Sequence, residues 1–478
     1  MTIVVTIVVY FAVLVAAGRM AAGKARGDNE AFFRGSRKSP WYMVAFGMVG
    51  ASISGVTFVS VPGMVLTSQM AYLQTCLGFI LGYFAVAFIL LPVYYRLNLT
   101  SIYAYIGERL GNRSHKTAAA FFILSKLTGA AVKFYVVCLI LQRFVLQETG
   151  IPFPVTVAAL VALIYLYTRH GGIKTLVWTD VFQTACLFLS LLLIIAHVAQ
   201  RLGLSPAEAV ETVARSDMSR IFVFDDCRDR QYFWKQFLSG IFIVIVMTGL
   251  DQGMMQKHLT CKSLREAQKD VCAYGFAFVP ANLLFLSLGV LLVMLARQEG
   301  MALPAGDELL PMYAATGRLG QTVTVVFTVG IVAASFCNAD SSLTALTTSC
   351  CVDIVGNARD ERLRKLTHIV LCALFAAIII GFNAINSTSA IDAIYILCSY
   401  TYGPLLGLFA FGLFTRRTPR DRLTPYIAIA SPLLCYALDQ GAQQLFGYHF
   451  GYELLMLNGA LTFAALCLLS TPTHAKSS

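Results

Sequence analysis

The sequence predicts an all-α membrane protein whose helices cross the bilayer about thirteen times. Composition is the first observation: 58% of the residues are hydrophobic, 13% are charged and the mean hydropathy is +0.71, far from the values of soluble globular chains. The second is a series of apolar runs of about 17 to 30 residues, each long enough to span a hydrocarbon core. The third is that one of these runs, 321–350, carries a carboxylate and many hydroxyls at membrane depth.

The apolar runs follow one another along the whole chain. The expected spans are 2–18, 40–66, 71–96, 117–146, 152–168, 175–200, 234–256, 272–297, 321–350, 366–383, 389–414, 425–446 and 450–470. The first is kept as a helix because only Gly18-Arg19-Met20 and a basic loop follow it, with no small-residue cleavage site. The longest connection, 201–233, is expected to be an outer loop with a short amphipathic helix at 206–215. The chain is therefore one membrane domain.

Lys and Arg are unevenly distributed among the connections. With the N-terminus outside, the inner connections hold most of the positive charges, for example Lys257, Lys262, Arg265 and Lys269 after the seventh span. This predicts an external N-terminus and an internal C-terminus. The net charge of +11 then reflects topology and not a nucleic-acid partner. The thirteen Cys show no metal-ligand spacing and are interpreted as small core residues.

Two of the spans contain signals for a break in the helix. The second combines Gly50 to Gly55 with Pro62-Gly63, and the seventh runs from Thr248-Gly249 to Gly253. Broken helices leave backbone carbonyls free at mid-membrane, where they bind cations, and they often open the two halves of an inverted repeat. The alternative is a helix that is merely kinked at Pro62 and packed through small residues.

The polar span 321–350 predicts a cation site. Positions 337, 340, 341, 344 and 348 share one helical face, so Asp340, Ser341 and Thr344 point to the same cavity. An intramembrane carboxylate costs about 2.5–3.5 kcal/mol on insertion, so such a residue usually has a function. The alternative is that Asp340 or Asp180 neutralises Lys126 or Lys133, which lie seven residues apart on one face of the fourth span.

These two lysines also indicate a class of solute. A cation that faces the broken helices can receive a carboxylate, which favours an anionic or zwitterionic solute over a hexose. Further candidates for lining the pocket are Ser54, Thr57, Gln69, Gln74, Thr248 and Tyr395. Each of them can equally be a packing residue that bonds neighbouring backbone. Asp251 is expected to make a structural bond near the inner gate.

Four ordered motifs resemble those of the sodium:solute symporter family, in particular its bacterial members. They cover about residues 30 to 415, and each lies on an expected span. They are Gly171-Gly172-Ile173 with Trp178-Thr179-Asp180 and Gln183; Asp251-Gln252 with Gln256-Lys257 and Lys262-Ser263; Asp340-Ser341 with Thr347-Thr348 and Asp353; and Tyr402-Gly403-Pro404-Leu405-Leu406-Gly407.

The resemblance implies a core of five plus five helices in an inverted repeat, the leucine-transporter-like (LeuT-like) fold. The expected division of residues 1–478 is 1–39 for the first helix and a basic inner loop, 40–200 and 234–414 for the two repeats, and 415–478 for two additional helices. It also implies two sodium sites. The first matches Gly50 or Ala51, Ile53, Ala334, Cys337 and Asn338, and the second matches Asp180, Asp340 and Ser341.

Cys337 and Asn338 depart from the family pattern, which has hydroxyls at these positions. A hard cation prefers oxygen ligands and a neutral thiol is a poor substitute, so the first site is expected to be weakened or built differently. This moves the expected primary cation site to Asp180 and Asp340.

The resulting hypothesis is a sodium-coupled secondary active symporter that imports a small organic solute by alternating access, in the plasma membrane, that is, the inner membrane of a bacterium. No enzyme is expected, because no nucleophile and base assemble in one segment. No cofactor is expected besides the coupling ion Na⁺, and no metal besides sodium. The expected partners are the solute, Na⁺ and the bilayer, without an obligate protein partner. The alternatives are proton coupling through Asp180 or Asp340 and a membrane-embedded sensor.

Overall fold

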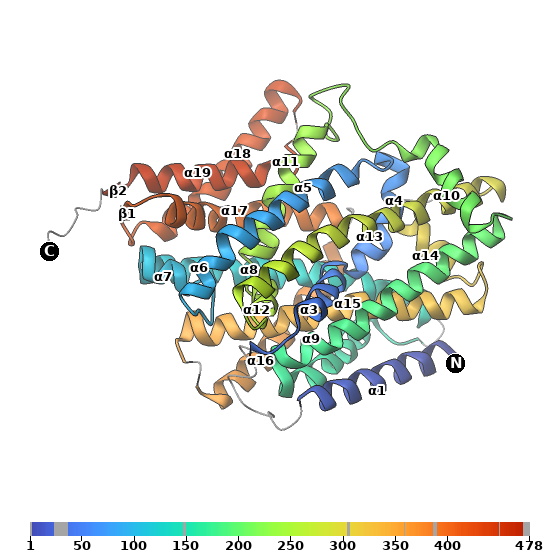
Figure 1. The fold of residues 1–478 in the computed structure, drawn as a ribbon, viewed down its shortest axis with the longest axis horizontal. Coiled ribbons are helices and arrows are strands. Elements are labelled where there is room, and N and C mark those ends of the chain that lie inside the picture. Colours follow the sequence, from blue (N-terminus) through green and yellow to red (C-terminus); the bar gives the residue numbers. More distant parts are fainter. Residues whose placement is uncertain are drawn as a thin grey trace.

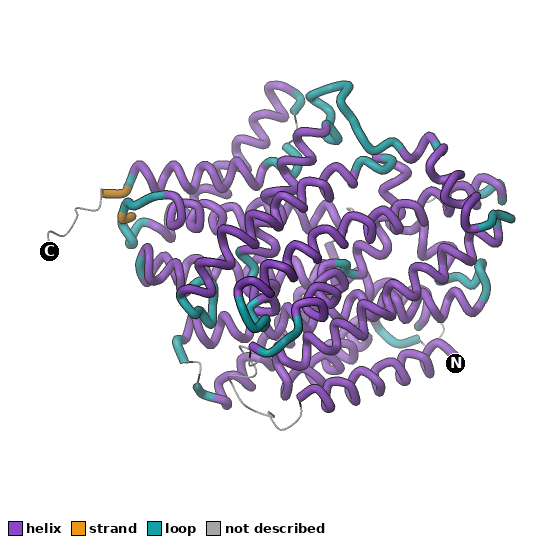
Figure 2. The backbone as a smooth tube through the Cα atoms, viewed as in Figure 1, coloured by secondary structure: helices purple, strands orange, loops and turns teal. Residues whose placement is uncertain are grey.

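The chain is helical along nearly its whole length (Figure 2). The structure, a computed structural model, describes residues 2–22, 37–146, 150–303, 306–357, 359–385, 390–448 and 450–471. Two short strands, β1 (Thr418–Pro419) and β2 (Ser470–Thr471), pair in antiparallel register with Thr418 opposite Thr471. This pair fastens the end of the described chain to the connection before α18.

The helices of the first half of the chain include one pair separated by a break, Trp41–Ser52 and Gly55–Ser68. The helices of this half are α1 (Thr2–Ala22), α3 (Trp41–Ser52), α4 (Gly55–Ser68), α5 (Tyr72–Ala85) with η2 (Val86–Leu90) and α6 (Leu91–Arg96), α7 (Ala104–Leu110), α8 (Asn112–Ile140) with η3 (Leu141–Val145), α9 (Phe153–Arg201), α10 (Pro206–Arg215) and η5 (Asp217–Ser219).

The second half of the chain also contains a helix pair separated by a break, Phe233–Gly249 and Gln252–His258. Its helices are α11 (Phe233–Val244) with η6 (Ile245–Gly249), α12 (Gln252–His258), α13 (Leu264–Gln298), η7 (Gly306–Glu308), α14 (Leu309–Ala314), α15 (Gln321–Ser349) with η8 (Cys350–Val355), α16 (Glu361–Ile385), α17 (Ala390–Phe414), α18 (Thr424–Phe446) and α19 (Leu454–Leu468).

Seven helices of the described residues are long and apolar enough to cross a membrane, and the number rises to nine when each of two bent helix pairs counts as one span. Three shorter apolar helices, Val5–Ala17, Phe153–Leu166 and Leu454–Leu468, accompany them. The prediction of an all-α, multi-pass membrane protein is confirmed.

Most helices run along the long axis of the molecule (Figure 1). The chain begins with α1 along one edge, and α18 and α19 lie along the opposite edge. Between these edges, α15 packs against α8, α9 and both halves of the broken helix α3/α4. The polar helix α15 is therefore in the interior, where its side chains from Val323 to Ser349 are almost all buried.

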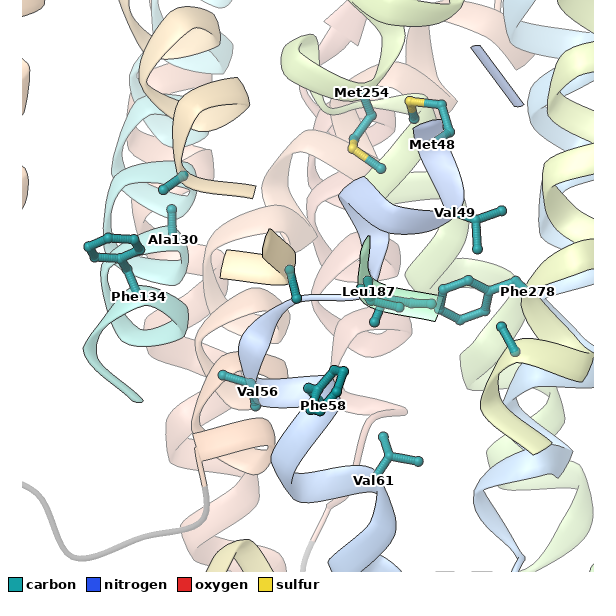
Figure 3. Close-up of a cluster of buried hydrophobic side chains, with 14 of the residues drawn as sticks. Met48, Val49, Val56, Phe58, Val61, Ala130, Phe134, Leu187, Met254 and Phe278 are labelled. Atoms are coloured by element: carbon teal, nitrogen blue, oxygen red, sulfur yellow. The ribbon is translucent and has the colours of Figure 1, made fainter. Parts of the chain in front are cut away.

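Both predicted breaks are present. α3 and α4 meet at 63°, and the segment Phe233–Gly249 meets α12 at 74°. Ile53 and Ser54 are extended and form the first break, while Pro62 lies inside α4. Figure 3 shows Met48 and Val49 on one side of this break and Val56, Phe58 and Val61 on the other. The alternative of a simple kink at Pro62 is therefore wrong.

Several helix boundaries differ from the sequence prediction; α13, for example, begins at Leu264 and not at 272. Helical backbone continues through the predicted connection 169–174, so α9 contains both of the expected spans 152–168 and 175–200. α8 begins at Asn112, before the predicted 117, because the Asp421 carboxylate accepts bonds from the backbone N–H groups of Arg113 (3.0 Å) and Ser114 (2.7 Å) at its first turn.

The predicted amphipathic helix in the 201–233 loop is confirmed as α10. Ser205 and Glu208 form a reciprocal capping box at its start. The bond from the Ser205 backbone N–H holds the pKa of the exposed Glu208 below its ordinary value.

Close helix contacts depend on small residues. A Cβ atom at Gly50 would collide with the Thr184 hydroxyl of α9, and one at Gly240 of α11 would collide with the Thr75 carbonyl of α5. Without a hydrophobic driving force between helices in lipid, such close approach is the main source of packing energy. The Gly50 contact holds the first half-helix α3 against α9, and the Gly240 contact holds α11 against α5.

Candidate functional site

A cavity lies where the two helix breaks meet α8, α13, α15 and α17. Its volume is about 120 Å³. Polar groups from several helices line it, among them Ser52 and Ser54 at the first break, Thr248 and Asp251 at the second, Ser125 on α8, Tyr274 on α13, Asn338 and Ser342 on α15, and Tyr402 on α17. The break of each half of the chain thus contributes to one central cavity.

Five of the eight predicted solute-site residues line this cavity: Ser54, Thr57, Lys126, Lys133 and Thr248. Gln69 and Gln74 do not. The Gln69 amide donates to the carbonyl of Asp217 (3.0 Å), and Gln74 donates to that of Gln231 (2.9 Å), so both fasten the 201–233 loop. The side chain of Tyr395 lies outside the described part of the structure.

Asp251 connects three helices at the edge of the cavity. One of its oxygens accepts bonds from the N–H groups of Gly253 (2.8 Å) and Met254 (3.1 Å) at the start of α12. The other lies 2.9 Å from the Lys126 ammonium of α8 and accepts a 2.8 Å bond from the Tyr402 hydroxyl of α17. Asp251 therefore has structural bonds, as predicted, but it lines the central cavity.

Lys133 lies two turns beyond Lys126 on α8 and also lines the cavity. Within the described ranges it has no carboxylate partner and no hydrogen bond. Two lysines and one aspartate leave the lining with one net positive charge. Lys133 is partly buried, and a cation withdrawn from water without a partner is costly unless an anion joins it.

A second charged cluster lies beside the first break. The Lys257 ammonium of α12 is 2.5 Å from the Asp180 carboxylate of α9, and both side chains are only 1% exposed. The other Asp180 oxygen accepts a 3.1 Å contact from the Cys337 thiol. Asp180 therefore does form an ion pair with a buried lysine, but its partner is Lys257 and not Lys126 or Lys133. Lys257 lies on α12, and not in an inner loop as the charge distribution predicted.

The first predicted sodium site contains a hydrogen bond between two groups of the protein. Gly50, Ala51 and Ile53 end the half-helix α3 opposite Ala334, Cys337 and Asn338 of α15, all of them buried. The Asn338 amide donates a 3.0 Å bond to the carbonyl oxygen of Ala51. A protein N–H thus lies against a carbonyl that the resemblance assigns to a cation.

Most α15 hydroxyls bond their own helix. Ser341, Ser342 and Thr348 each donate to the carbonyl four residues earlier, at 2.7–2.9 Å. A hydroxyl that donates its proton in this way keeps its oxygen lone pairs for another partner. The Ser341 hydroxyl also lies 3.1 Å from the fully buried Asp340 carboxylate. The Thr344 hydroxyl, one turn further, is buried without a protein partner in the described structure.

Sequence reasoning missed Lys257 and Tyr402 as site residues and placed Asp251 at the gate. The signal was the second break itself: Asp251 follows it directly, and Lys257 lies six residues further on a helix of only seven residues. Tyr274 was missed as well. Its hydroxyl bonds that of Ser52 at the first break, which connects α13 to the end of α3.

Two bent helices around a central cavity, with buried opposite charges beside them, define a polytopic membrane transporter. The chain belongs to the sodium:solute symporter family, whose family model matches residues 32–421. This is a family of transporters and not of enzymes.

Individual relatives agree with this assignment. The human sodium/iodide cotransporter is 29% identical over 252 residues, which are 52% of this chain and 38% of that protein. The sodium/sialic acid symporter SiaT of Proteus mirabilis is 25% identical over 415 residues, 81% of this chain and 79% of the relative. The chain thus spans well under two thirds of the first of these relatives.

A solved structure shows the same fold. A substrate-bound, outward-open Na⁺-coupled sialic acid symporter superposes with a TM-score of 0.82 at 20% identity, covering 97% of this chain and 96% of that one. The chain therefore has the same overall helical fold as this Na⁺-coupled symporter.

Proposed function

We propose that this protein is a sodium-coupled symporter that imports a small carboxylate-bearing solute. The observation that carries the proposal is the opposite charge of two neighbouring clusters. The cavity lining of Lys126, Lys133 and Asp251 has one net positive charge, and Asp180, Asp340 and Lys257 together have one net negative charge. An anionic solute and a cation are the ligands that neutralise these clusters.

The solute class follows from the free ammonium in the cavity. Lys133 is able to bind a carboxylate without breaking an existing pair, whereas Lys126 is engaged with Asp251. The name of the Proteus mirabilis relative, a sialic acid symporter, is consistent with such a solute. The polar groups around the lysines, such as Ser54 and Thr248, are suited to hydroxyl or amide groups of the same solute.

The cation site we propose is centred on Asp340, with the hydroxyl oxygens of Ser341 and Thr344 and with Asp180 nearby. Carboxylate and hydroxyl oxygens are the ligands that a hard cation prefers. The unpartnered Thr344 hydroxyl supports this assignment, because a buried polar group without a partner costs about 1–3 kcal/mol.

The topology belongs to the same proposal: about thirteen spans, an outer N-terminus and an inner C-terminus in a bacterial inner membrane. The start of α1 and the β1/β2 pair lie at opposite ends of the helices (Figure 1), which fits an odd number of spans. The bends at corresponding places, α3/α4 and α11/α12, support two repeats at 40–200 and 234–414.

The proposal is tested by uptake into proteoliposomes. A thermal-shift screen of sialic acid, short monocarboxylates, amino acids and hexoses, each with Na⁺ or K⁺, first identifies a solute. We then expect an inward Na⁺ gradient to drive accumulation of that solute at constant pH. Uptake driven equally well by a proton gradient without Na⁺ would contradict sodium coupling and favour the proton alternative.

Replacing Lys133 by Gln tests the solute class. We expect the apparent affinity for a carboxylate solute to fall about tenfold or more, because a charge-assisted bond contributes about 1.5–3 kcal/mol. Thermal stability should not decrease, since no carboxylate loses its partner. Lys133→Arg, which keeps the charge, is the control. Equal affinities in Lys133→Gln and wild type would remove Lys133 from the solute site.

A further inference from the structure

In each of the two sodium sites that the family pattern implies, a donor of the protein itself lies against one of the ligands. At the first, the Asn338 amide donates to the Ala51 carbonyl. At the second, the Lys257 ammonium lies 2.5 Å from Asp180, whose other oxygen contacts the Cys337 thiol. We infer that Asn338 permanently replaces the cation of the first site and that Lys257 permanently replaces a cation at Asp180. The protein consequently moves a single Na⁺ with each solute, bound at Asp340, the other carboxylate of the second site. This inference rests on the proposed sodium coupling.

The Asn338 contact makes the first position a poor sodium site. A carbonyl at the end of a half-helix lacks an intrahelical donor and needs either a cation or an N–H group. Here the amide supplies the N–H at 3.0 Å. A sodium ion at this place would have to displace the amide, and the neighbouring thiol of Cys337 would give it a weak ligand in exchange.

The Lys257 contact excludes a mobile ion from Asp180, one of the three ligands of the second site. Lys257 is 1% exposed, so its ammonium has no access to water if it leaves Asp180. Breaking a buried pair leaves an uncompensated charge, which is far more costly than breaking one at the surface. A sodium ion cannot therefore replace the lysine without a second anion to receive it.

Asp340 is the other carboxylate of the second site. It is fully buried, and Lys257 interacts electrostatically with it as well as with Asp180. Two carboxylates and one ammonium leave a single negative charge for a mobile ion. The buried and unpartnered hydroxyl of Thr344, one turn from Asp340, is an independent sign of a ligand at this place.

The inference predicts the ratio of ions to solute. With a singly charged carboxylate, one Na⁺ makes each transport cycle electroneutral. A second Na⁺ would add one net charge per cycle, and 100 mV would then change the limiting accumulation by about 50-fold. Voltage and isotope counting therefore distinguish one ion from two.

The experiment measures ²²Na⁺ and solute uptake together in proteoliposomes whose voltage is set by a K⁺ gradient and valinomycin. We expect about one Na⁺ per solute, a Hill coefficient near one and, for a singly charged carboxylate, accumulation that does not change with voltage. Two Na⁺ per solute in the wild type would overturn the inference and leave the proposed coupling intact. Uptake that does not depend on Na⁺ would overturn both the proposed sodium coupling and the inference.

Asn338→Ser gives the matched gain-of-site test, because it restores a hydroxyl at the first position. We expect this variant to bind an additional Na⁺, with a Hill coefficient that rises toward two and an accumulation that becomes voltage-dependent. Thr328→Ser, ten residues earlier on the same helix, controls for a general effect on α15. An Asn338→Ser protein that is folded by thermal shift and still moves one Na⁺ would contradict the role of Asn338.

Discussion

Replacing Lys257 by Gln is expected to destabilise the protein by about 3–5 kcal/mol, the largest effect of any single substitution considered for the cation cluster. The reason is the burial of its partner. Asp180 is 1% exposed, and without the ammonium it keeps only the Cys337 thiol as a donor among the described contacts of its side chain. A buried carboxylate in this state must either remain charged without compensation or take up a proton.

Thermal unfolding in detergent measures this effect. The double variant Asp180→Asn/Lys257→Gln removes both charges and is expected to recover most of the stability, since neutralising both partners of a buried pair is often tolerated. Lys262→Gln, at an exposed position four residues past the helix end at His258, is the control and should change stability by less than about 0.5 kcal/mol. A single Lys257→Gln variant as stable as that control would show that the pair is not formed.

The second large effect is expected at Asp251. Asp251→Ala removes the cap of α12, the bond from Tyr402 and the partner of Lys126 in one step. The cap contributes about 0.5–2 kcal/mol, and the unpaired buried lysine costs more. We expect uptake, normalised to the amount of folded protein, to fall at least about a hundredfold, because the second helix break loses its connection to α8 and α17.

Asp251→Asn separates these contributions. Its carbonyl oxygen can still accept the cap bonds from Gly253 and Met254, but an NH₂ group replaces the oxygen that accepts from Tyr402 and faces Lys126, so the Tyr402 bond and the charge are lost. Its uptake and its thermal stability should therefore lie between those of the wild type and of Asp251→Ala. If the Ala variant transported at the wild-type rate, the connection through Asp251 would have no role in transport.

The breaks, the amphipathic loop helix and the polar interior helix were predictable from the sequence because each has a local signal. Glycines with Ser54 mark the first break, and the capping box of Ser205 and Glu208 marks α10. Apolar length and hydroxyl content mark α15. These signals come from residues close together in the sequence, so they do not depend on tertiary contacts.

Partners across helices were not predictable in this way. Lys257 was counted among the inner-loop cations because the charge distribution treats each lysine after a span alike. Its true position depends on the 74° bend, which turns a short helix back into the bundle toward α9. Gln69 and Gln74 have the composition of pocket residues, but the fold of the 201–233 loop supplies their partners.

The central claim is that a cation near Asp340 and an anionic solute near Lys133 stabilise one another. The most direct measurement is calorimetric titration of the solute into the purified protein at increasing Na⁺, with K⁺ keeping the ionic strength constant. We predict that Na⁺ lowers the Kd of the solute, that the solute tightens Na⁺ binding by the same factor, as linkage requires, and that Asp340→Asn abolishes the effect of Na⁺. A solute Kd that is the same in Na⁺ and in K⁺ would contradict the claim.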